Sequence, residues 1–374
     1  MQSFHPPRRL LLGPGPSDVP RRILDALARP TIGHLDPAYV GMMEELKTLL
    51  RYAFKTANPL TIPVSAPGSA GMEACFVNLV EPGDTVIVCR NGVFGGRMRE
   101  NVVRAGASAV MVDDEFGRPV DPEKVEAALR ANPGAKALAF VHAETSTGAR
   151  SDAATLCRLA REHGALSIVD TVTSLGGCEV DVDGWGADAV YSGSQKCLSA
   201  PPGLSPVTFS PRATETVKAR KVPVQSWFLD MSLVMAYWDG TGGRSYHHTA
   251  PINMTYALHE SLLILHEEGL EAAWARHQAN HERLRAGLQT MGLALLGDDD
   301  GARLPQLNPV VVPEGVDEAG VRRALLDDHG IEIGAGLGPL AGKIWRIGLM
   351  GASSRPEAVD RLLGALAQAL GRSR

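Results

Sequence analysis

Residues Leu166–Lys196 read LSIVDTVTSLGGCEVDVDGWGADAVYSGSQK, and this stretch gives the strongest indication of the fold. It contains two short apolar runs, at 166–169 and 187–191, and each has the length and composition of a buried strand. A carboxylate, Asp170, ends the first run, and an amine, Lys196, follows the second after a few small polar residues. In an α/β sheet, binding and catalytic groups lie just beyond the carboxyl ends of the strands. We therefore expect Asp170 and Lys196 to come from neighbouring strand ends.

A carboxylate and a lysine in this arrangement are the groups that a pyridoxal phosphate (PLP) site requires. The lysine holds the cofactor as a Schiff base, and a buried carboxylate pairs with the pyridinium nitrogen so that the ring can accept electrons. The alternative is a surface lysine after one strand and an unrelated helix-capping aspartate after the other. Asp170 and Lys196 alone do not separate these interpretations.

The composition is that of an ordinary globular protein of 374 residues, with 44% hydrophobic and 21% charged residues. The formal net charge is −5 and basic residues do not gather into a run, so we expect neither nucleic acid nor a membrane surface as a partner. No apolar stretch approaches the roughly 20 residues of a membrane helix. The five cysteines are scattered without a CxxC pair, which is typical of reduced thiols, and we expect a cytoplasmic protein.

Strand and helix patterns alternate along the first two thirds of the chain. We expect strands at 85–89, 110–112, 136–141 and 207–209, and helices at 38–54, 72–79, 122–130 and 152–163. Such alternation predicts an α/β fold with a mainly parallel sheet, right-handed crossovers and helices on both faces.

The last third mixes its elements differently. We expect a helical region at 254–296 that breaks near Gly269, helices at 318–329 and 356–370, and strands at 306–312, 331–333 and 343–349. We therefore divide the chain into an N-terminal arm (1–20), a large domain (21–254) and a smaller α+β C-terminal domain (255–374).

A loop of small residues, SAPGSAG at 65–71, precedes the helix expected from Met72. Backbone N–H groups and the positive end of a helix dipole can hold a phosphate at such a place. A simple tight turn is the alternative.

Two other patterns do not support a site. LGPLAGK at 337–343 lacks the first glycine of a P-loop, and Ile344 stands where a magnesium-binding Ser or Thr is required. The adjacent His247 and His248 have no further ligands at a suitable spacing, so we expect no metal.

Seven motifs together resemble the class V, fold-type I PLP-dependent aminotransferases, and within them the alanine–glyoxylate/serine–pyruvate branch. In chain order they are LLGPGP (11–16), NGVFG (91–95), HAETSTG (142–148), VDTVTSLGG (169–177), SGSQK (192–196), YHHTAP (246–251) and RIGLMG (346–351). The resemblance covers nearly the whole chain. It implies a large domain with a mainly parallel seven-stranded sheet between helices, PLP as cofactor, and a homodimer.

The resemblance also implies roles at the cofactor ring. Lys196 matches the Schiff-base lysine and Asp170 the carboxylate on the pyridine nitrogen. Phe94 matches the aromatic residue that stacks on the ring, a position where the branch commonly has tryptophan. Thr145 matches the hydroxyl that hydrogen-bonds on the side of the phenolic oxygen.

Further matches concern the phosphate. On one chain they are Gly68, Ser69, Ala70 and Gln195. Pro67 stands where the family usually has serine, so one hydroxyl and one N–H are missing. Tyr246 and Thr249 match residues that reach the phosphate from the other subunit, which implies active sites shared across a dimer interface.

Arg346 matches the arginine that holds the substrate carboxylate, a role suited to the bidentate fork of a guanidinium. Gly15 in the N-terminal arm and His34 are further candidate substrate-binding residues. The implied reaction moves an amino group from alanine or serine to glyoxylate or pyruvate by a ping-pong mechanism, most simply as an alanine–glyoxylate transaminase.

Three alternatives stay open. One is a class V aminotransferase for another small amine, of serine–glyoxylate or aminoethylphosphonate type. A second is a cysteine desulfurase-like lyase, which stacks a histidine where Phe94 stands and needs a late cysteine, whereas no cysteine follows Cys197. The third is an inactive binding protein of this fold, which the pair of Asp170 and Lys196 disfavours.

Overall fold

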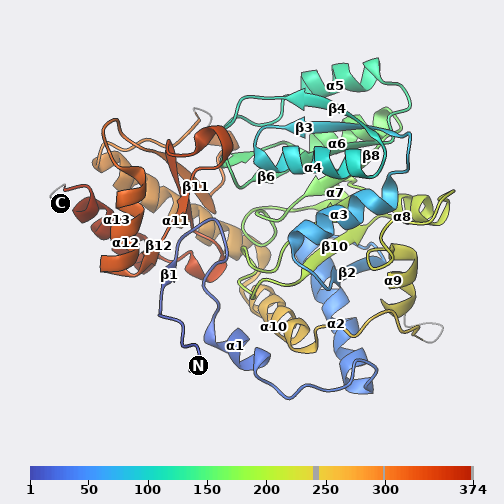
Figure 1. Cartoon of the computed structure of the whole chain (residues 1–374), viewed down its shortest axis with the longest axis horizontal. Helices are drawn as coiled ribbons and strands as arrows, with labels where there is room; N and C mark the ends of the chain where they lie inside the picture. Colours follow the sequence, from blue (N-terminus) through green and yellow to red (C-terminus); the bar gives the residue numbers. More distant parts are fainter. Residues whose placement is uncertain (239–243, 298–299, 372–374) are drawn as a thin grey trace.

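A seven-stranded sheet forms the centre of the computed structural model, which describes residues 1–238, 244–297 and 300–371 (Figure 1). The strand order is β2–β10–β9–β8–β5–β3–β4. The strands are β2 (Leu60–Val64), β3 (Thr85–Arg90), β4 (Ser108–Asp113), β5 (Ala137–Val141), β8 (Leu166–Asp170), β9 (Ala189–Tyr191) and β10 (Ser205–Phe209). Within this sheet β10 runs antiparallel to β2 and β9, and the other pairings are parallel. The mainly parallel sheet expected from the sequence is confirmed.

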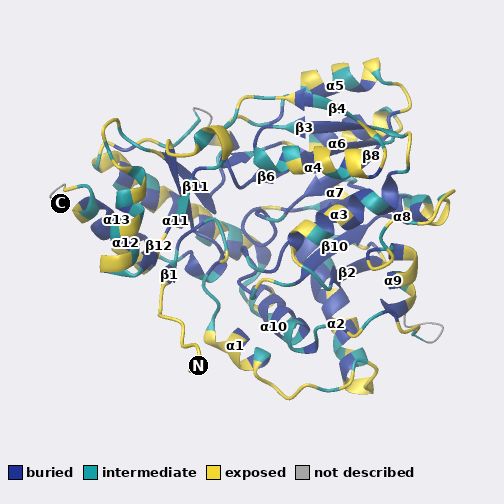
Figure 2. Cartoon of the chain, viewed as in Figure 1, coloured by how far each residue is buried: buried dark blue, intermediate teal, exposed yellow. Residues whose placement is uncertain are grey.

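Two groups of helices flank the sheet (Figure 1). In one group α3 (Gly68–Leu79) packs beside α4 (Val93–Arg104), and in the other α6 (Ala153–Glu162) packs beside α5 (Pro122–Ala131) and α7 (Val182–Trp185). Every residue of β2, β5, β8, β9 and β10 is buried, and Figure 2 shows the centre of the sheet in dark blue. Strands covered by helices on both faces consist of nearly continuous apolar residues, and this pattern predicted β5, β8 and β9. The strand β2, which contains Pro63, was not predicted, and β10 was predicted only over 207–209.

Further helices pack on β2, on β10 or on one another beside these strands. They are α1 (Arg21–Leu27), α2 (Pro37–Phe54), α8 (Pro211–Lys218), α9 (Met231–Trp238) and α10 (Ile252–Glu268). The helix α2 packs against β2, and α10 packs against both α1 and α2. No described helix combines the length and apolar character that a bilayer crossing requires.

A second hydrophobic core lies in the last third of the chain and contains the side chains of Leu284, Leu325, Trp345 and Leu362. The elements after α10 are α11 (Leu270–Thr290), β11 (Leu307–Val311), α12 (Glu318–His329), β12 (Ile331–Glu332), β13 (Gly334–Ala335), β14 (Ile344–Gly348) and α13 (Pro356–Ala369). Strands β11, β14 and β13 form an antiparallel sheet in that order.

The N-terminal arm joins this second core to the large sheet. Its strand β1 (Leu10–Leu11) pairs in parallel with β12, and Leu12 is buried in the second core. A few residues later, the N–H of Ser17 donates to the carbonyl of Gln195 at 3.0 Å. The arm therefore connects the last third of the chain to the segment that carries Lys196.

One helical prediction extends too far. Helical periodicity predicts a region up to residue 296, but α11 ends at Thr290. Gly292 has a φ of 67°, a left-handed conformation that commonly ends helices. Beyond it, Leu295 forms a bridge with Val310 of β11 and so joins the smaller sheet.

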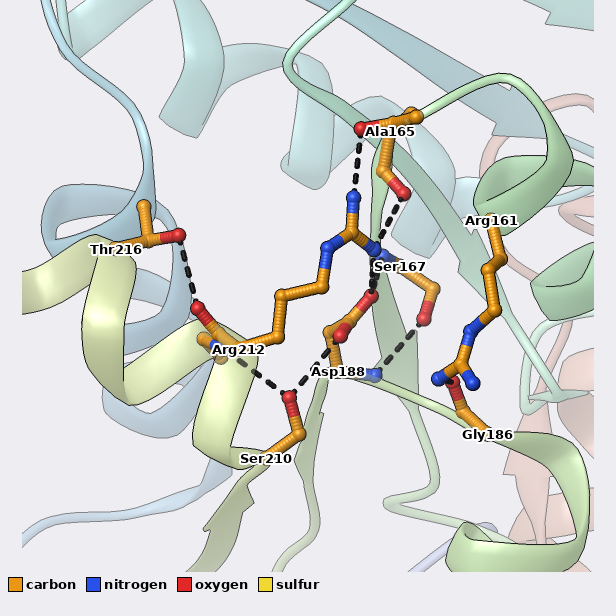
Figure 3. Close-up of polar contacts among 10 residues, drawn as sticks. Arg161, Ala165, Ser167, Gly186, Asp188, Ser210, Arg212 and Thr216 are labelled. Atoms are coloured by element: carbon orange, nitrogen blue, oxygen red, sulfur yellow. Dashed lines mark hydrogen bonds and ion pairs between the residues drawn. The ribbon is translucent and has the colours of Figure 1, made fainter.

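Asp188 connects β8, β9 and α8 through its hydrogen bonds (Figure 3). It precedes Ala189 of β9, so it lies at the end of the sheet away from Asp170. Its buried carboxylate accepts hydrogen bonds from the Ser167 N–H, the Ser210 hydroxyl and the Arg212 guanidinium, each at 3.0 Å. In return the Asp188 N–H donates to the Ser167 hydroxyl at 2.9 Å. Because burying an unpaired carboxylate is costly, these donors are what allow Asp188 to lie in the interior.

Candidate active site

Asp170 is the last residue of β8, and its carboxylate is buried and held from two sides. One oxygen accepts the N–H of Val172 at 2.8 Å, and the other accepts the hydroxyl of Tyr191 at 2.7 Å. Burial raises the pKa of Asp170 to about 6, while these two hydrogen bonds and the charges of Lys196 and Arg97 oppose the rise. Asp170 is therefore a fixed carboxylate that a buried cation would hold in the charged form.

Lys196 lies in a buried loop after β9, and its side chain meets the N-terminal arm. The ammonium donates a hydrogen bond to the carbonyl of Pro14. Burial and, to a smaller extent, the nearby charge of Arg346 together lower the pKa of Lys196 to about 8. An amine with a pKa near neutrality is available as a nucleophile and as a proton carrier.

The arm approaches Lys196 closely because residue 15 is glycine. Gly15 has a φ of 105°, and a Cβ there would lie 2.6 Å from the Cδ of Lys196. The hydroxyl of Ser17 donates to the carbonyl of Lys196 at 2.8 Å. The predicted residue Gly15 thus packs directly against the lysine side chain.

A pocket brings together most of the residues predicted for the cofactor ring and phosphate. The predicted residues that line it are Gly68, Ser69, Phe94, Thr145, Asp170, Gln195 and Lys196. Pro67, Met72, Arg97, Val141, Val172 and Tyr191 complete the lining. Ala70 lies one residue beyond the lining, and its N–H donates to the carbonyl of Pro67 at 2.7 Å.

The start of α3 has the properties of a phosphate cradle. The helix begins at Gly68, and its N-cap residue, Pro67, makes no side-chain hydrogen bond to the first turn. Gln195 lines the same pocket, and its buried Oε1 atom has no hydrogen-bond partner among the described residues. Open helix N–H groups and an unsatisfied buried amide both call for a polar ligand, and the phosphate end of PLP fits this place.

Arg346 comes from β14, in the second core region, and reaches the loop that carries Thr145. Its Nε donates to the carbonyl of Ala335 at 2.7 Å and its Nη1 to the carbonyl of Thr145 at 3.3 Å. Among the described residues no carboxylate forms an ion pair with it, and burial lowers its pKa to about 10. The nearby charge of Glu144 opposes this fall, but the hydrogen-bond acceptors of the guanidinium are neutral carbonyls. Such a guanidinium is suited to bind a carboxylate ligand.

Three predicted residues lie apart from this pocket. Tyr246 is 61% exposed, and its hydroxyl lies 3.3 Å from that of Thr249. The ring of His34 lies against the ring of Tyr246, with centroids 5.2 Å apart. None of the three lines the pocket that contains Lys196 of the same chain.

Residues 11–360 match the family model of class-V aminotransferases. The chain belongs to the class V aminotransferase family. It is 40% identical to the alanine–glyoxylate aminotransferase of Oryctolagus cuniculus, covering 97% of this chain and 93% of the relative. It is 39% identical to the (S)-ureidoglycine–glyoxylate transaminase of Bacillus subtilis (strain 168), and the match covers 96% of this chain and 90% of that relative.

The crystal structure of the alanine–glyoxylate aminotransferase from Nostoc sp. matches with a TM-score of 0.96 at 48% identity, covering 99% of this chain and 97% of that chain. As a class V aminotransferase, the protein uses PLP and moves an amino group between an amino acid and a 2-oxo acid. The expected family, fold, cofactor and general reaction are confirmed.

Two polar residues of the pocket of this class V aminotransferase, Tyr191 and Arg97, were not predicted from the sequence. Tyr191 pairs in register with Asp170 across β8 and β9, so the parallel arrangement of the two predicted strands could have indicated the contact. Arg97 lies with its guanidinium carbon 4.7 Å from the centre of the Phe94 ring. The helix α4 brings it there, and a prediction of that helix would have placed Arg97 one turn beyond Phe94.

Proposed function

We propose that this aminotransferase takes its amino group from alanine or serine and passes it to glyoxylate or pyruvate, as an alanine–glyoxylate transaminase in the first place. The observation that carries the proposal is the buried Arg346, which forms no ion pair with a carboxylate among the described residues and contacts the Thr145 carbonyl beside the pocket. Alanine, serine, glyoxylate and pyruvate all have a carboxylate group, and a guanidinium can bind a carboxylate through two parallel hydrogen bonds. The two relatives named above and the Nostoc protein all carry glyoxylate in their names.

We assign the steps of the reaction to residues of the pocket. PLP supplies an electron sink for the bond broken at the substrate Cα. Asp170 keeps the pyridine nitrogen protonated, and Lys196, once its amine is free, moves the proton from the substrate Cα. Gly68, Ser69 and Gln195 bind the phosphate, and Phe94 stacks on the ring.

We propose that two chains form a homodimer in which Tyr246 and Thr249 complete the partner's phosphate site. Support comes from their position, since Tyr246 is largely exposed and lies outside the pocket of its own chain. The ring of Tyr246 packs on His34, which is the reason to group His34 with this shared face. We also propose a cytoplasmic location, which the five free, buried cysteines support.

The substrate assignment is tested by steady-state kinetics. Alanine, serine and (S)-ureidoglycine are each paired with glyoxylate and with pyruvate, and kcat/KM is compared across the pairs. We expect parallel lines in double-reciprocal plots, as for a ping-pong mechanism, and the highest value for alanine with glyoxylate. A much higher value for (S)-ureidoglycine would overturn the choice of donor and leave the aminotransferase assignment intact.

A further inference from the structure

We propose that Glu144 is a positioning residue of this active site, whose buried carboxylate holds Phe94 and Thr145 in a fixed relation to each other. The inference rests on the proposed function of those two residues. Glu144 itself is neither a ring-stacking nor a hydroxyl-bearing residue and does not line the cofactor pocket.

The carboxylate of Glu144 is the meeting point of three hydrogen-bond donors. Glu144 ends strand β6 (Ala143–Glu144) and is 0% exposed. Its Oε1 accepts the N–H of Ser146 at 2.9 Å and the hydroxyl of Ser146 at 2.6 Å, and its Oε2 accepts the N–H of Phe94 at 3.2 Å. Burial raises the pKa of Glu144 to about 7, while these hydrogen bonds from Ser146 and Phe94 oppose the rise and favour the ionised form, which only accepts hydrogen bonds.

These contacts form the N-terminal cap of α4. The N-cap residue, Gly92, makes no side-chain hydrogen bond. Instead, the N–H of Val93 donates to the Ser146 hydroxyl at 2.9 Å, and the N–H of Phe94 donates to Glu144. The first N–H groups of a helix need such partners, and here the partners come from a loop about fifty residues later in the chain.

The backbone leaves room for this cap at one glycine. A Cβ at Gly92 would lie 2.3 Å from both Cγ and Cδ of Glu144 and 2.6 Å from the hydroxyl of Ser146. Any side chain at residue 92 would therefore displace the carboxylate or the helix start. The hydrogen bonds that Glu144 accepts therefore depend on the absence of a side chain at residue 92.

The cap links three functional groups. Phe94 lies in the first turn of the capped helix, and Thr145 lies between the two capping residues. The carbonyl of Thr145 accepts a hydrogen bond from Arg346. A shift of Glu144 would therefore change the position of the Phe94 ring relative to the Thr145 hydroxyl. It would also move the Thr145 carbonyl that Arg346 contacts.

Glu144→Gln tests this role because it keeps the size of the side chain and replaces one oxygen by an NH2 group. In either orientation of the amide, that NH2 group faces an N–H or O–H donor. In the cofactor-free protein we expect faster amide hydrogen exchange in peptides covering 91–96 and 143–148. On loading with PLP we expect about tenfold weaker binding and an altered visible circular dichroism of the bound cofactor.

Asp188→Asn is the matched control. Asp188 is also a buried carboxylate with three donors (Figure 3), but it precedes β9, at the end of the sheet away from Asp170. We expect this variant to lower Tm while leaving exchange at 91–96 and the affinity for PLP unchanged. If Glu144→Gln behaved in the same way, its role would be stability alone and the proposal would be overturned.

Ser146→Ala is a milder second variant for the case that Glu144→Gln does not fold. It removes the acceptor for Val93 and one donor to Glu144 and leaves the carboxylate in place. Smaller changes in the same exchange and dichroism signals support the proposal, and wild-type signals contradict it. If the unmodified chain bound no PLP, the proposed function would fail, whereas the exchange comparison would still decide whether Glu144 holds residues 91–96.

Discussion

The two groups at the centre of the pocket have pKa values displaced toward each other. Burial raises the pKa of Asp170 to about 6 and lowers that of Lys196 to about 8. Each shift shows that burial disfavours the charged form of the group. A ligand group of opposite charge would therefore stabilise the charged form of either residue, and the neutral amine of Lys196 is available to react with the cofactor. Perturbed pairs of this kind are typical of catalytic sites.

Asp170→Asn gives a prediction for stability against pH. The folded pKa of Asp170 lies above its ordinary value of 3.8, so folding favours the protonated form, and stability is lost as the pH rises from about 4 through about 6. Asparagine does not ionise, so the variant does not lose stability in this pH range through residue 170. In the cofactor-free proteins, the free energy of unfolding of the variant relative to wild type should therefore rise by roughly 2–3 kcal/mol between pH 4 and pH 8. Urea unfolding at both pH values measures it, and a constant difference would contradict a raised pKa.

Arg346→Lys separates charge from geometry in the proposed contact of Arg346 with the substrate carboxylate. Lysine keeps the positive charge but loses the bidentate fork. We expect KM for alanine and for glyoxylate to rise about tenfold with a smaller change in kcat. Equal KM values for variant and wild type would show that Arg346 does not hold the substrate.

At the scale of elements, the N-terminal arm contributes to the site by its backbone. Gly15→Ala puts a Cβ 2.6 Å from the Cδ of Lys196 at a φ of 105°. We expect weaker PLP binding and a stability loss of about 1–3 kcal/mol. Gly13→Ala is the control, because a Cβ there meets its nearest atoms at 3.8 Å and beyond. If both variants bound PLP like wild type, the arm would not constrain Lys196.

Local sequence patterns predicted those strands and helices whose apolar spacing or capping residues lie within or next to the element itself. The strands that end at Asp170 and Tyr191 and the helix capped by Asp121 were predicted in this way. The helix α4 was missed because its cap comes from Glu144 and Ser146, far along the chain, and not from its N-cap residue Gly92.

Contacts between distant segments could not be derived from local patterns. The Lys196 ammonium meets Pro14, 182 residues away, and Arg346 meets Thr145, 201 residues away. Both contacts depend on how the arm and the last third of the chain pack against the large sheet. The resemblance to the family indicated the residues involved, whereas the partners became apparent only in the folded chain.

At the scale of the whole molecule, the proposed homodimer with a shared site predicts complementation. Lys196→Ala chains and Tyr246→Ala chains should each be nearly inactive alone. After unfolding and refolding together, mixed dimers contain one site with native Lys196 and a native Tyr246 from the other chain, so activity should return. If Tyr246 acts within its own chain, the mixture stays inactive.

The central claim is that Lys196 and the pocket around Asp170 carry out half of a transamination. The direct measurement is the absorbance spectrum of the PLP-loaded protein before and after addition of L-alanine, and then of glyoxylate. We predict a band at about 420 nm that falls on adding alanine while absorbance grows at about 330 nm, and that returns with glyoxylate. The Lys196→Ala variant should show no such exchange. A wild-type protein that stays colourless with added PLP would contradict the account, as would full cycling by the variant.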